Sequence, residues 1–578
     1  MNGKLTVVST LALLAAAGCS IPLSEGSPFQ TNLCSSDSDC QAGSVCASVN
    51  ESSLCASTTA DLPAVVFEVR PGASGLITPP SLIGPVDISS LAGSAVIDLP
   101  LAIPQYVDVS PGRVFLPCAG DNPVPAKVSL LPIPDYSGLL EKQAYEAEPT
   151  LDESGKDAFH VQVPPGKYDV YIEPHPDLVL TPDCAGAPPI YLPAMEITKD
   201  AGFVIHASDP FTVVGTLKLS QKEDFTKWHL ELVEPNSGQT ISDVIQPVQT
   251  GIDLEVPFQL RFDWSARKQF TPLLRLRPPD GSGKPVIHWS LAAVASSSLN
   301  EQEVQVKLDV SGVDTQPRKV AGQVFHDTKP VPATVTLRSK GGPGGDLVRF
   351  ETSVATDPLG RFEATVPRRE YTLIARPYSD DFAFGVTDWD TQTGADCFCG
   401  NVVEVPSATT LAGSVTGPTG EIVEAEARIS PTASAALPYL GSMLDDEIPP
   451  RPASALTEGG HFQLHVDGGT FDFSIAAPQS SGYPWLVRPR QIVSSPTADA
   501  SPVVSLDPFQ LQMPAIVRGT VIGADGQVLP GATVRAWIGV SDPKNPDAPP
   551  SAVQIAETVA DDQGVYVLLL PPSIKQGD

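Results

Sequence analysis

A short run of strand, turn and strand recurs along this chain and constrains its fold more than any other feature. The clearest copy, DPLGRFEATVPRREYTLIARP, runs from Asp357 to Pro377, and related copies occur at 157–174, at 457–478 and from Asp561 onwards. Apolar and polar residues alternate within each copy, so every second side chain shares one face, as in a half-buried β-strand. Gly supplies positive φ at the turns and Asp caps them. The repeat therefore predicts several β-hairpins of one kind.

The copies also share the spacing of their aromatic residues. In three of them a second aromatic residue follows the first after nine positions. The pairs are Phe159 and Tyr168, Phe362 and Tyr371, and Phe462 and Phe471. The segment before each copy repeats as well, as a Gly, a short strand, a turn and an alternating strand, for example in GQVFHDTKPVPATVTLRS from Gly322. A repeat of roughly 60–100 residues suits an independent β-sandwich better than a solenoid unit.

The proline content supports an all-β chain. There are 60 prolines in 578 residues, about twice the average frequency. Proline at this density breaks helices and favours short strands joined by turns. No long window after the N-terminus shows an apolar period of 3.6 residues. Because 578 residues are too many for a single hydrophobic core, we predict several β-domains in tandem.

The repeated plan resembles the carboxypeptidase regulatory-like domain, a transthyretin-like β-sandwich. The family's typical run is a Gly-x-Val strand, PVPGATV, an Asp-x-x-Gly turn before an aromatic residue, and a second turn of the PPG type. The fit is closest at Arg518–Leu570 and Val320–Pro377, fair at Leu411–Pro478 and looser at Gly112–Pro174. The resemblance covers about half of the chain and implies the fold, but it says little about function because the scaffold serves many roles.

We therefore expect tandem transthyretin-like β-sandwiches behind a small Cys-rich module. The expected segments are a signal peptide at 1–18, a tether at 19–32, the Cys-rich module at 33–56, a β-sandwich with the first repeat at 60–200, a β-rich domain of uncertain type at 203–310, and regulatory-like sandwiches at 318–406, 409–508 and 514–578. The stretch 211–308 alternates in TVVGTLKLS but lacks the second half of the motif, so its type stays open.

The last of these sandwiches is expected to be truncated. Its copy of the motif ends in PPSIKQGD, where Gly577 and Asp578 stand at the turn that precedes Tyr168 in the first copy. The strand that should follow this turn is missing from the sequence. A sandwich without its closing strand would expose an unpaired edge and part of its core, which is a liability for aggregation or for capture of another chain's strand.

The N-terminus resembles the leader of a bacterial lipoprotein. Lys4 precedes an apolar run from Leu5 to Ala17, which is too short for a stable membrane span and is typical of a signal peptide. The run ends in AAGC, which is similar to a lipobox, and Cys19 is the residue that this resemblance implies to be acylated. An ordinary signal peptide with a chance cysteine is the alternative. Acyl chains on Cys19 would anchor the protein, and the non-acidic Ser20 favours the outer membrane.

Eight further cysteines in an exported chain favour disulfides. Four lie close together, at Cys34, Cys40, Cys46 and Cys55, and resemble small Cys-rich modules that follow the lipobox in Gram-negative lipoproteins. Two disulfides would stabilise a segment whose Ser, Asp and Gly residues cannot form a core, and three pairings are open. The absence of a CxxC pair argues against a metal site here.

The remaining four cysteines lie beside two copies of the repeat. Cys118 and Cys184 flank the first copy, so we expect a disulfide across that domain. Beside the copy at 357–377, Cys397 corresponds to Cys184. No cysteine corresponds to Cys118 there, so Cys399 is the candidate partner of Cys397. A Cys-x-Cys disulfide closes a strained ring and is easily reduced. A redox role, a local staple and an intermolecular bridge are therefore all open.

Charge and motifs exclude several functions. The net charge of −31 repels phosphate backbones, so no nucleic acid partner is expected. The chain has no HExxH, GxSxG or nucleotide-binding loop, and we predict no catalytic centre and no cofactor. His461 and His465 share a strand face but have no evident third ligand, so no metal site is predicted either.

Three aromatic residues are candidates for stacking on sugars, because some relatives of this sandwich bind glycans. Tyr483 and Trp485 lie in the Pro/Gly stretch SGYPWLVRP, and Trp389 lies in an acidic stretch. The alternative is that these rings plug the edges of sandwiches. The sequence thus favours a lipid-anchored rod of sandwiches on the outer membrane, with a structural or binding role toward envelope proteins or surface glycans. A carbohydrate-binding protein and an enzyme with its site in 211–308 are the alternatives.

Overall fold

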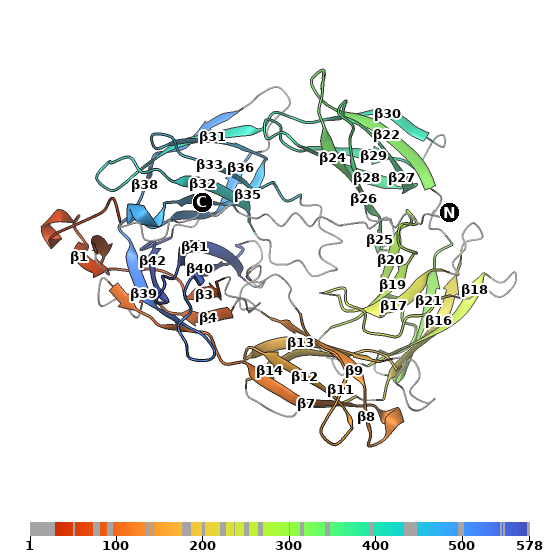
Figure 1. The fold of residues 1–578 in the computed structure, drawn as a ribbon. Coiled ribbons are helices and arrows are strands. Elements are labelled where there is room, and N and C mark those ends of the chain that lie inside the picture. The colour runs from red at the N-terminus through yellow and green to blue at the C-terminus, as the bar shows by residue number, and fades with distance from the viewer. Residues whose placement is uncertain are drawn as a thin grey trace, which may run out of the picture.

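The described part of the chain is built almost entirely of β-strands (Figure 1), which confirms the all-β prediction. The computed structural model describes residues 29–49, 52–72, 81–89, 96–133, 139, 144–175, 187–198, 203–207, 209–219, 227–235, 237–247, 254–263, 270–299, 301–311, 317–340, 347–392, 397–432, 448–494, 502–543, 546 and 550–574. Within these ranges α1 (Leu291–Val294) is the one α-helix.

The third sandwich shows the repeating unit most clearly. In its first sheet β22 (Pro317–His326) pairs antiparallel with β27 (Arg361–Pro367) and parallel with β30 (Cys397–Glu404). The second sheet has the order β26 (Glu351–Ala355), β24 (Ala333–Ser339), β28 (Glu370–Pro377) and β29 (Gly385–Asp390). Short β23 (Lys329–Pro330) pairs with β22. Alternate residues of both sheets, such as Val324 and Leu373, fill the core between them.

The first and fourth sandwiches repeat this seven-strand plan. The strands of the first are β7 (Val107–Phe115), β9 (Ala126–Pro132), β10 (Tyr145–Ala147), β12 (Asp157–Val163), β13 (Gly166–Pro174), β14 (Ile190–Ile197) and β15 (Val204–His206), with short β8 (Pro123–Val124) and β11 (Thr150–Leu151). Those of the fourth are β31 (Thr409–Thr416), β32 (Glu426–Pro431), β33 (Ala453–Leu456), β34 (His461–Val466), β35 (Gly469–Ala476), β36 (Leu486–Val493), β37 (Val503–Ser505) and β38 (Phe509–Gln510). In both, the long first strand again has an antiparallel and a parallel neighbour.

The stretch of uncertain type is a second sandwich of the same plan. Its strands are β16 (Phe211–Lys218), β17 (His229–Val233), β18 (Glu255–Phe262), β19 (Leu273–Arg277), β20 (Val286–Ser290) and β21 (Glu303–Asp309). β16 pairs antiparallel with β18 and parallel with β21, as β22 does with β27 and β30. Strand β25 (Leu347–Arg349), from the third sandwich's part of the chain, extends the second sheet by pairing with β20.

The fifth sandwich combines the two ends of the described chain. Its C-terminal strands are β39 (Ala515–Ile522), β40 (Thr533–Val540), β41 (Ser551–Val559) and β42 (Val565–Leu570), and its N-terminal strands are β3 (Val65–Arg70), β4 (Ser81–Val86), β5 (Val96–Asp98) and β6 (Leu101–Ala102). One sheet has the order β4–β3–β40–β41, and in the other β39 pairs with β42, β5 and β6. One continuous core includes residues from both ends.

One cross-strand pair recurs in all five sandwiches. A Gly on the long first strand lies opposite an aromatic residue on its antiparallel neighbour. The pairs are Gly112 and Phe159, Gly215 and Phe258, Gly322 and Phe362, Gly413 and Phe462, and Gly519 and Tyr566. A Cβ atom on Gly413 would lie 2.7 Å from the Phe462 ring. At Gly112, Gly322 and Gly413 the aromatic ring therefore leaves room for Gly alone, which explains why the two residues recur together in these copies.

The five sandwiches follow one another around a ring (Figure 1), in which the red and orange strands β3 and β4 lie beside the dark blue strands β40 and β41. Three expectations are therefore wrong. The segment 60–200 is not one sandwich, because β3, β4, β5 and β6 belong to the fifth. The sandwich from 514 has no open edge beside β40, because β3 occupies it. The chain is not a rod, because its two ends share a core.

Candidate functional site: the seam of the ring

Strand β3 occupies the place in the fifth sandwich that β28 holds in the third. On β28, Leu373 lies opposite Leu337 of β24. On β3, Phe67 lies opposite Ala536 of β40. Leu337 and Ala536 hold the same position in the repeated motif, two residues after the Val of ATV. The N-terminal strand thus enters in the register of the closing strand that the sequence analysis found missing after the last turn.

Both faces of β3 are buried, which makes the seam tight. Val65, Phe67 and Val69 point into the core of the fifth sandwich. On the other face, Val66 packs with Ala552 and with Leu139, which follows β9 of the first sandwich. A strand buried on both sides contributes more apolar burial than an edge strand, at about 25 cal/mol per Å² removed from water. The closure is therefore part of the core and not a surface contact.

A buried carboxylate specifies the pairing of β3 with β40. The side chain of Glu68 is 0% exposed, and its Oε2 accepts a hydrogen bond of 3.0 Å from Trp537 Nε1. Its Oε1 lies 2.5 Å from Arg70 Nε, which reaches solvent. A buried charge without partners would cost several kcal/mol. Because Trp537 belongs to β40 while Arg70 lies on β3 with Glu68, a shift of β3 along β40 would separate the charge from its indole donor.

The second sheet closes with a parallel pair. Arg518 of β39 lies opposite Asp98 of β5, and its Nε is 2.7 Å from Asp98 Oδ1. Tyr566 on β42 donates a hydrogen bond of 2.7 Å to the Leu99 carbonyl. A Cβ atom at Gly519 would lie 2.0 Å from the same carbonyl oxygen. The N-terminal segment therefore passes over the glycine that faces Tyr566, where only Gly leaves room.

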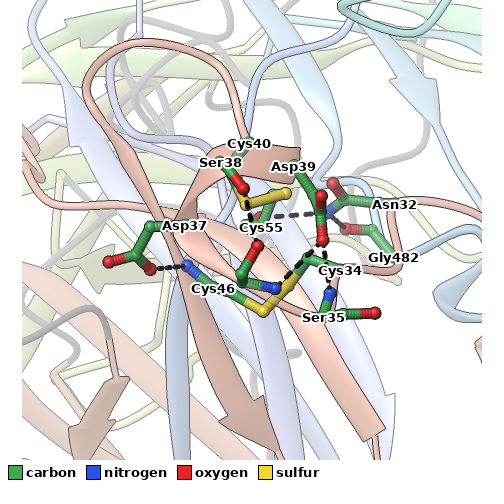
Figure 2. The surroundings of a disulfide bond; sticks show 11 residues. Asn32, Cys34, Ser35, Asp37, Ser38, Asp39, Cys40, Cys46, Cys55 and Gly482 are labelled. Carbon is green, nitrogen blue, oxygen red and sulfur yellow. Dashed lines mark hydrogen bonds between the residues drawn. A yellow bond between two sulfur atoms is a disulfide. The ribbon is translucent and has the colours of Figure 1, made fainter.

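Two disulfides hold the Cys-rich module that precedes β3 (Figure 2). They join Cys34 to Cys46 and Cys40 to Cys55, which settles the pairing that the sequence left open. The module contains η1 (Asp37–Asp39) and the hairpin of β1 (Ser44–Val49) and β2 (Ser52–Ser57).

Two aspartates shape the loop between the module's first two cysteines (Figure 2). Asp39 Oδ2 accepts hydrogen bonds from the backbone N–H groups of Ser35 and Ser36 at 2.7 and 3.0 Å. These bonds lower the pKa of the Asp39 carboxyl. Asp37 Oδ1 accepts a bond of 2.8 Å from the backbone N–H of Cys46. The loop is thus fixed by side-chain caps where it has no apolar core.

The module is wedged between the fourth and fifth sandwiches. Asn32 Nδ2 donates to the carbonyls of Cys55 and Gly482, at 3.0 and 2.8 Å (Figure 2). Leu54 of the module shares a small core with Ile516 of the fifth sandwich. Residues 29–32, expected to be part of a tether, are therefore docked on the fourth sandwich. The module fastens the strands that close the ring to the neighbouring domain.

The module's sulfur atoms are not available to a metal ion. The Sγ atoms of Cys34, Cys40 and Cys55 lie within 4.8 Å of one another, a spacing that thiolates around a metal would also have. All three are oxidised in disulfides. A metal ligand must be a deprotonated thiolate, so in this state the cluster is a staple.

Of the other cysteines with a predicted role, the structure describes Cys118 and Cys399. Cys118 and Cys399 are each disulfide-bonded. Cys19, Cys184 and the Cys397 side chain lie outside the described residues. The pairing of Cys118 with Cys184 and the pairing of Cys399 with Cys397 stay predictions. Peptide mapping under non-reducing conditions would check both.

The expectation of exposed aromatic residues for sugars is wrong for Tyr483 and Trp389. Tyr483 is 4% exposed, and its hydroxyl donates to Glu421. The Cys-rich module covers the loop around it, because a Cβ atom on Gly482 would meet Leu54 at 3.1 Å. Trp389 is 7% exposed and stacks on Phe362 at 5.9 Å between centroids. Neither ring presents a face to a ligand.

The third candidate, Trp485, is half-buried. Its ring packs against the core of the fifth sandwich, and the Arg428 guanidinium lies 5.3 Å from its centroid. One face of the indole is therefore already engaged in a cation–π contact. Trp485 fastens the fourth sandwich to the fifth.

Buried acids in the second sandwich have structural partners. Glu231 is 1% exposed, lies 2.9 Å from Arg275 Nε and accepts a bond of 2.8 Å from Thr240. Asp243 is similarly paired with Arg261. Ion-paired and hydrogen-bonded carboxylates of this kind satisfy a buried charge. The described residues of 211–308 thus give no observation that favours an enzyme site there.

No family model and no curated protein matches this chain. Among solved structures it is similar to the Bacillus anthracis TIE protein (10% identity over 70% of this chain and 74% of that chain, TM-score 0.15) and to a streptococcal ancillary pilin (12%, 52% and 99%, 0.18). The shaft pilin SpaA from Lactobacillus rhamnosus GG is a further match (11%, 34% and 96%, 0.17).

TM-scores this low carry no argument about function. The strand pairing by itself shows a protein of repeated β-sandwiches. Among the described residues, no helix has the length and apolar character needed to span a membrane.

Proposed function

We propose that this chain is a lipid-anchored protein of the bacterial outer membrane, with a structural or binding role and no catalytic centre. Its repeats would belong with carboxypeptidase regulatory-like, transthyretin-like sandwiches. The observation that carries the proposal is the seam: the segment next to the predicted anchor, Cys19, is the segment that closes the ring. An anchor placed there would attach the membrane to the whole ring and not to one flexible end.

The distance between anchor and ring is short. Phe29, the first described residue, lies ten positions after Cys19, and ten residue steps span at most about 35 Å when extended. Gln30 is already bonded to the fourth sandwich through its backbone N–H, 2.6 Å from the Ser480 carbonyl oxygen. An acylated Cys19 would therefore hold the ring close to the membrane surface.

Rigid joints between sandwiches suit a scaffold that presents a fixed surface. At the joint of the third and fourth sandwiches, Asp467 is buried and accepts two bonds from the Arg451 guanidinium, at 2.9 and 3.0 Å. The guanidinium also donates to the carbonyls of Pro377 and Phe382 in the third sandwich, at 2.9 and 2.5 Å. Asp467 further accepts a bond of 3.0 Å from the Phe384 N–H. Such a network has one satisfied geometry, so it fixes the angle between neighbours.

The joint of the first and second sandwiches is aromatic. Tyr171 and Tyr191 stack at 4.6 Å between centroids and belong to the core cluster of the second sandwich. The Tyr171 hydroxyl is 3.0 Å from Ser237 Oγ. Burial raises the pKa of Tyr171 to about 12, so its hydroxyl stays protonated over the physiological range. The partners of such a scaffold would be other envelope proteins.

Mass spectrometry of the mature N-terminus after extraction from membranes tests the anchor. We expect an acylated Cys19, and release of the Cys19→Ser variant into the soluble fraction. As a matched control, Ser20→Ala keeps the cysteine and should stay with the membrane. An unmodified mature N-terminus at another residue would contradict the proposal.

A further inference from the structure

A cavity of about 350 Å³ lies between the two sheets of the fourth sandwich. Its walls are mostly apolar and include Leu411 of β31, Phe473 of β35 and Phe509 of β38. At its rim, Ile492 is 73% exposed and Val504 is 40% exposed. This volume falls in the range of about 300–1,000 Å³ that is typical of small-ligand sites. Apolar residues exposed at a cavity rim are usual where an apolar ligand enters.

One wall carries a hydroxyl without a partner. Thr409, the first residue of β31, lines the cavity and is 1% exposed, and its Oγ1 has no hydrogen-bond partner in the described structure. A buried hydroxyl without a partner destabilises the folded state, because it has lost its bonds to water. A ligand that bonds to Thr409 would remove this cost.

The opposite wall carries a cation. Arg488 of β36 lines the cavity, and its guanidinium lies over the Phe509 ring, 4.6 Å from the centroid. Among the described residues no carboxylate pairs with Arg488, whereas its neighbour Arg490 is ion-paired with Asp542 at 3.0 Å. A half-buried guanidinium over an aromatic face is partly desolvated, which strengthens its attraction for an anion.

We propose that this cavity binds an amphipathic carboxylate, a small molecule with an apolar body and one carboxylate head. The head would bond to the Arg488 guanidinium and accept from the Thr409 hydroxyl, and the body would fill the space between Leu411 and Phe473. A neutral amphiphile would leave the cation unpaired, and an amphiphilic amine would face a like charge. The site therefore selects on charge as well as on apolar volume.

Calorimetric titration of the full chain with decanoate, decanol, decylamine and acetate tests the site. We expect saturable binding of decanoate at one site, at least tenfold weaker binding of decanol and decylamine, and no binding of acetate. Arg488→Met should weaken decanoate binding about tenfold or more, because it removes a hydrogen bond between two charged groups. Thr409→Val should weaken it about fivefold.

The matched control is Arg490→Met, two residues along the same strand, which should leave decanoate binding unchanged. Leu411→Phe should block the cavity. If that variant fails to fold, the thermal shift of wild type, Arg488→Met and Arg490→Met in decanoate decides, because a bound ligand raises Tm. No binding of decanoate, or equal binding to wild type and Arg488→Met, would overturn the proposal.

Discussion

Glu68 and Trp537 are 469 residues apart in the sequence and are joined by a hydrogen bond of 3.0 Å between the indole N–H and the carboxylate. This bond lies at the centre of the seam, where β3 runs beside β40. It pairs a charge that must have partners with a donor that only the correct register supplies. The ring is thus closed by a specific polar contact inside an apolar interface.

Removing the indole donor should weaken the seam. In Trp537→Phe the buried Glu68 carboxylate loses one of its two partners, so we expect the free energy of unfolding of the fifth sandwich to fall by about 1–3 kcal/mol. Urea unfolding followed by hydrogen exchange of residues 65–70 measures this. The control is Trp485→Phe, which shortens a half-buried ring on the same core without removing a described hydrogen bond. Equal stability of the two variants would contradict the role of the bond.

A methyl group at Gly519 should open the seam. Its Cβ would lie 2.0 Å from the Leu99 carbonyl oxygen, so Gly519→Ala should cost about 1–3 kcal/mol or more through overpacking. We expect faster proteolysis within residues 60–103. Gly166→Ala is the matched control, because its Cβ would meet nothing closer than the Tyr168 ring at 3.7 Å. If both variants resist protease as well as wild type does, the close approach at Gly519 is incorrect.

The buried ion pair at the joint of the third and fourth sandwiches should be costly to break. Asp467→Asn leaves the Arg451 guanidinium with carbonyl partners only, and we expect a loss of about 3–5 kcal/mol. The exposed pair of Lys319 and Glu363, 2.6 Å apart, serves as the control, and Glu363→Gln should cost less than about 1 kcal/mol. Thermal unfolding of both variants gives the comparison. Similar small losses would show that the joint does not depend on the pair.

Alkaline pH should unfold the sandwiches. Burial raises the pKa of Tyr371 well above its ordinary value, and its hydroxyl donates a bond of 2.7 Å to the Pro367 carbonyl. The folded state then holds a proton that the unfolded state releases above pH ~10. This contribution is fully present below pH ~10 and is lost as pH rises toward the folded-state pKa. Tyrosinate absorbance and circular dichroism should therefore change together for the buried tyrosines. Tyrosinate formation by all tyrosines before any loss of structure would contradict this.

The hairpins and the cross-strand aromatic residues could be predicted because they depend on local alternation and on turn residues. The pairing of the N-terminal strands with the C-terminal half of the fifth sandwich could not be predicted, because β3 reads VVFEVR and carries no signal for a partner beyond residue 530. Alternation of apolar and polar residues shows which side chains share a face of a strand, but it does not show which other strand pairs with it. The sequence does not reveal the type of the second sandwich, because it lacks the PPG turn. Gly215 and Phe258 nevertheless keep the cross-strand pair.

The solvent exposure predicted for Tyr483 is wrong for a related reason. The Pro/Gly stretch around Tyr483 resembles an exposed loop, but the Cys-rich module, more than 400 residues away in sequence, covers it through Asn32 and Leu54. Burial by a segment that is distant in the sequence leaves no pattern in the residues around the buried side chain. The pairing of the module's four cysteines was also beyond the sequence, because three connectivities satisfy the same spacing.

Closure of the ring within one molecule is most directly tested by an engineered disulfide across the seam. Asp98 and Arg518 lie opposite each other on β5 and β39, strands spaced about 4.8 Å apart, within disulfide reach. The double variant Asp98→Cys/Arg518→Cys replaces both members of an exposed pair. As control, Asp98→Cys is combined with Ala321→Cys, which precedes Gly322 as Arg518 precedes Gly519. We predict an intramolecular cross-link between residues 98 and 518 in the monomer, found by peptide mapping, and none in the control. A cross-link that forms only between molecules, or equally in both variants, would contradict the closed ring.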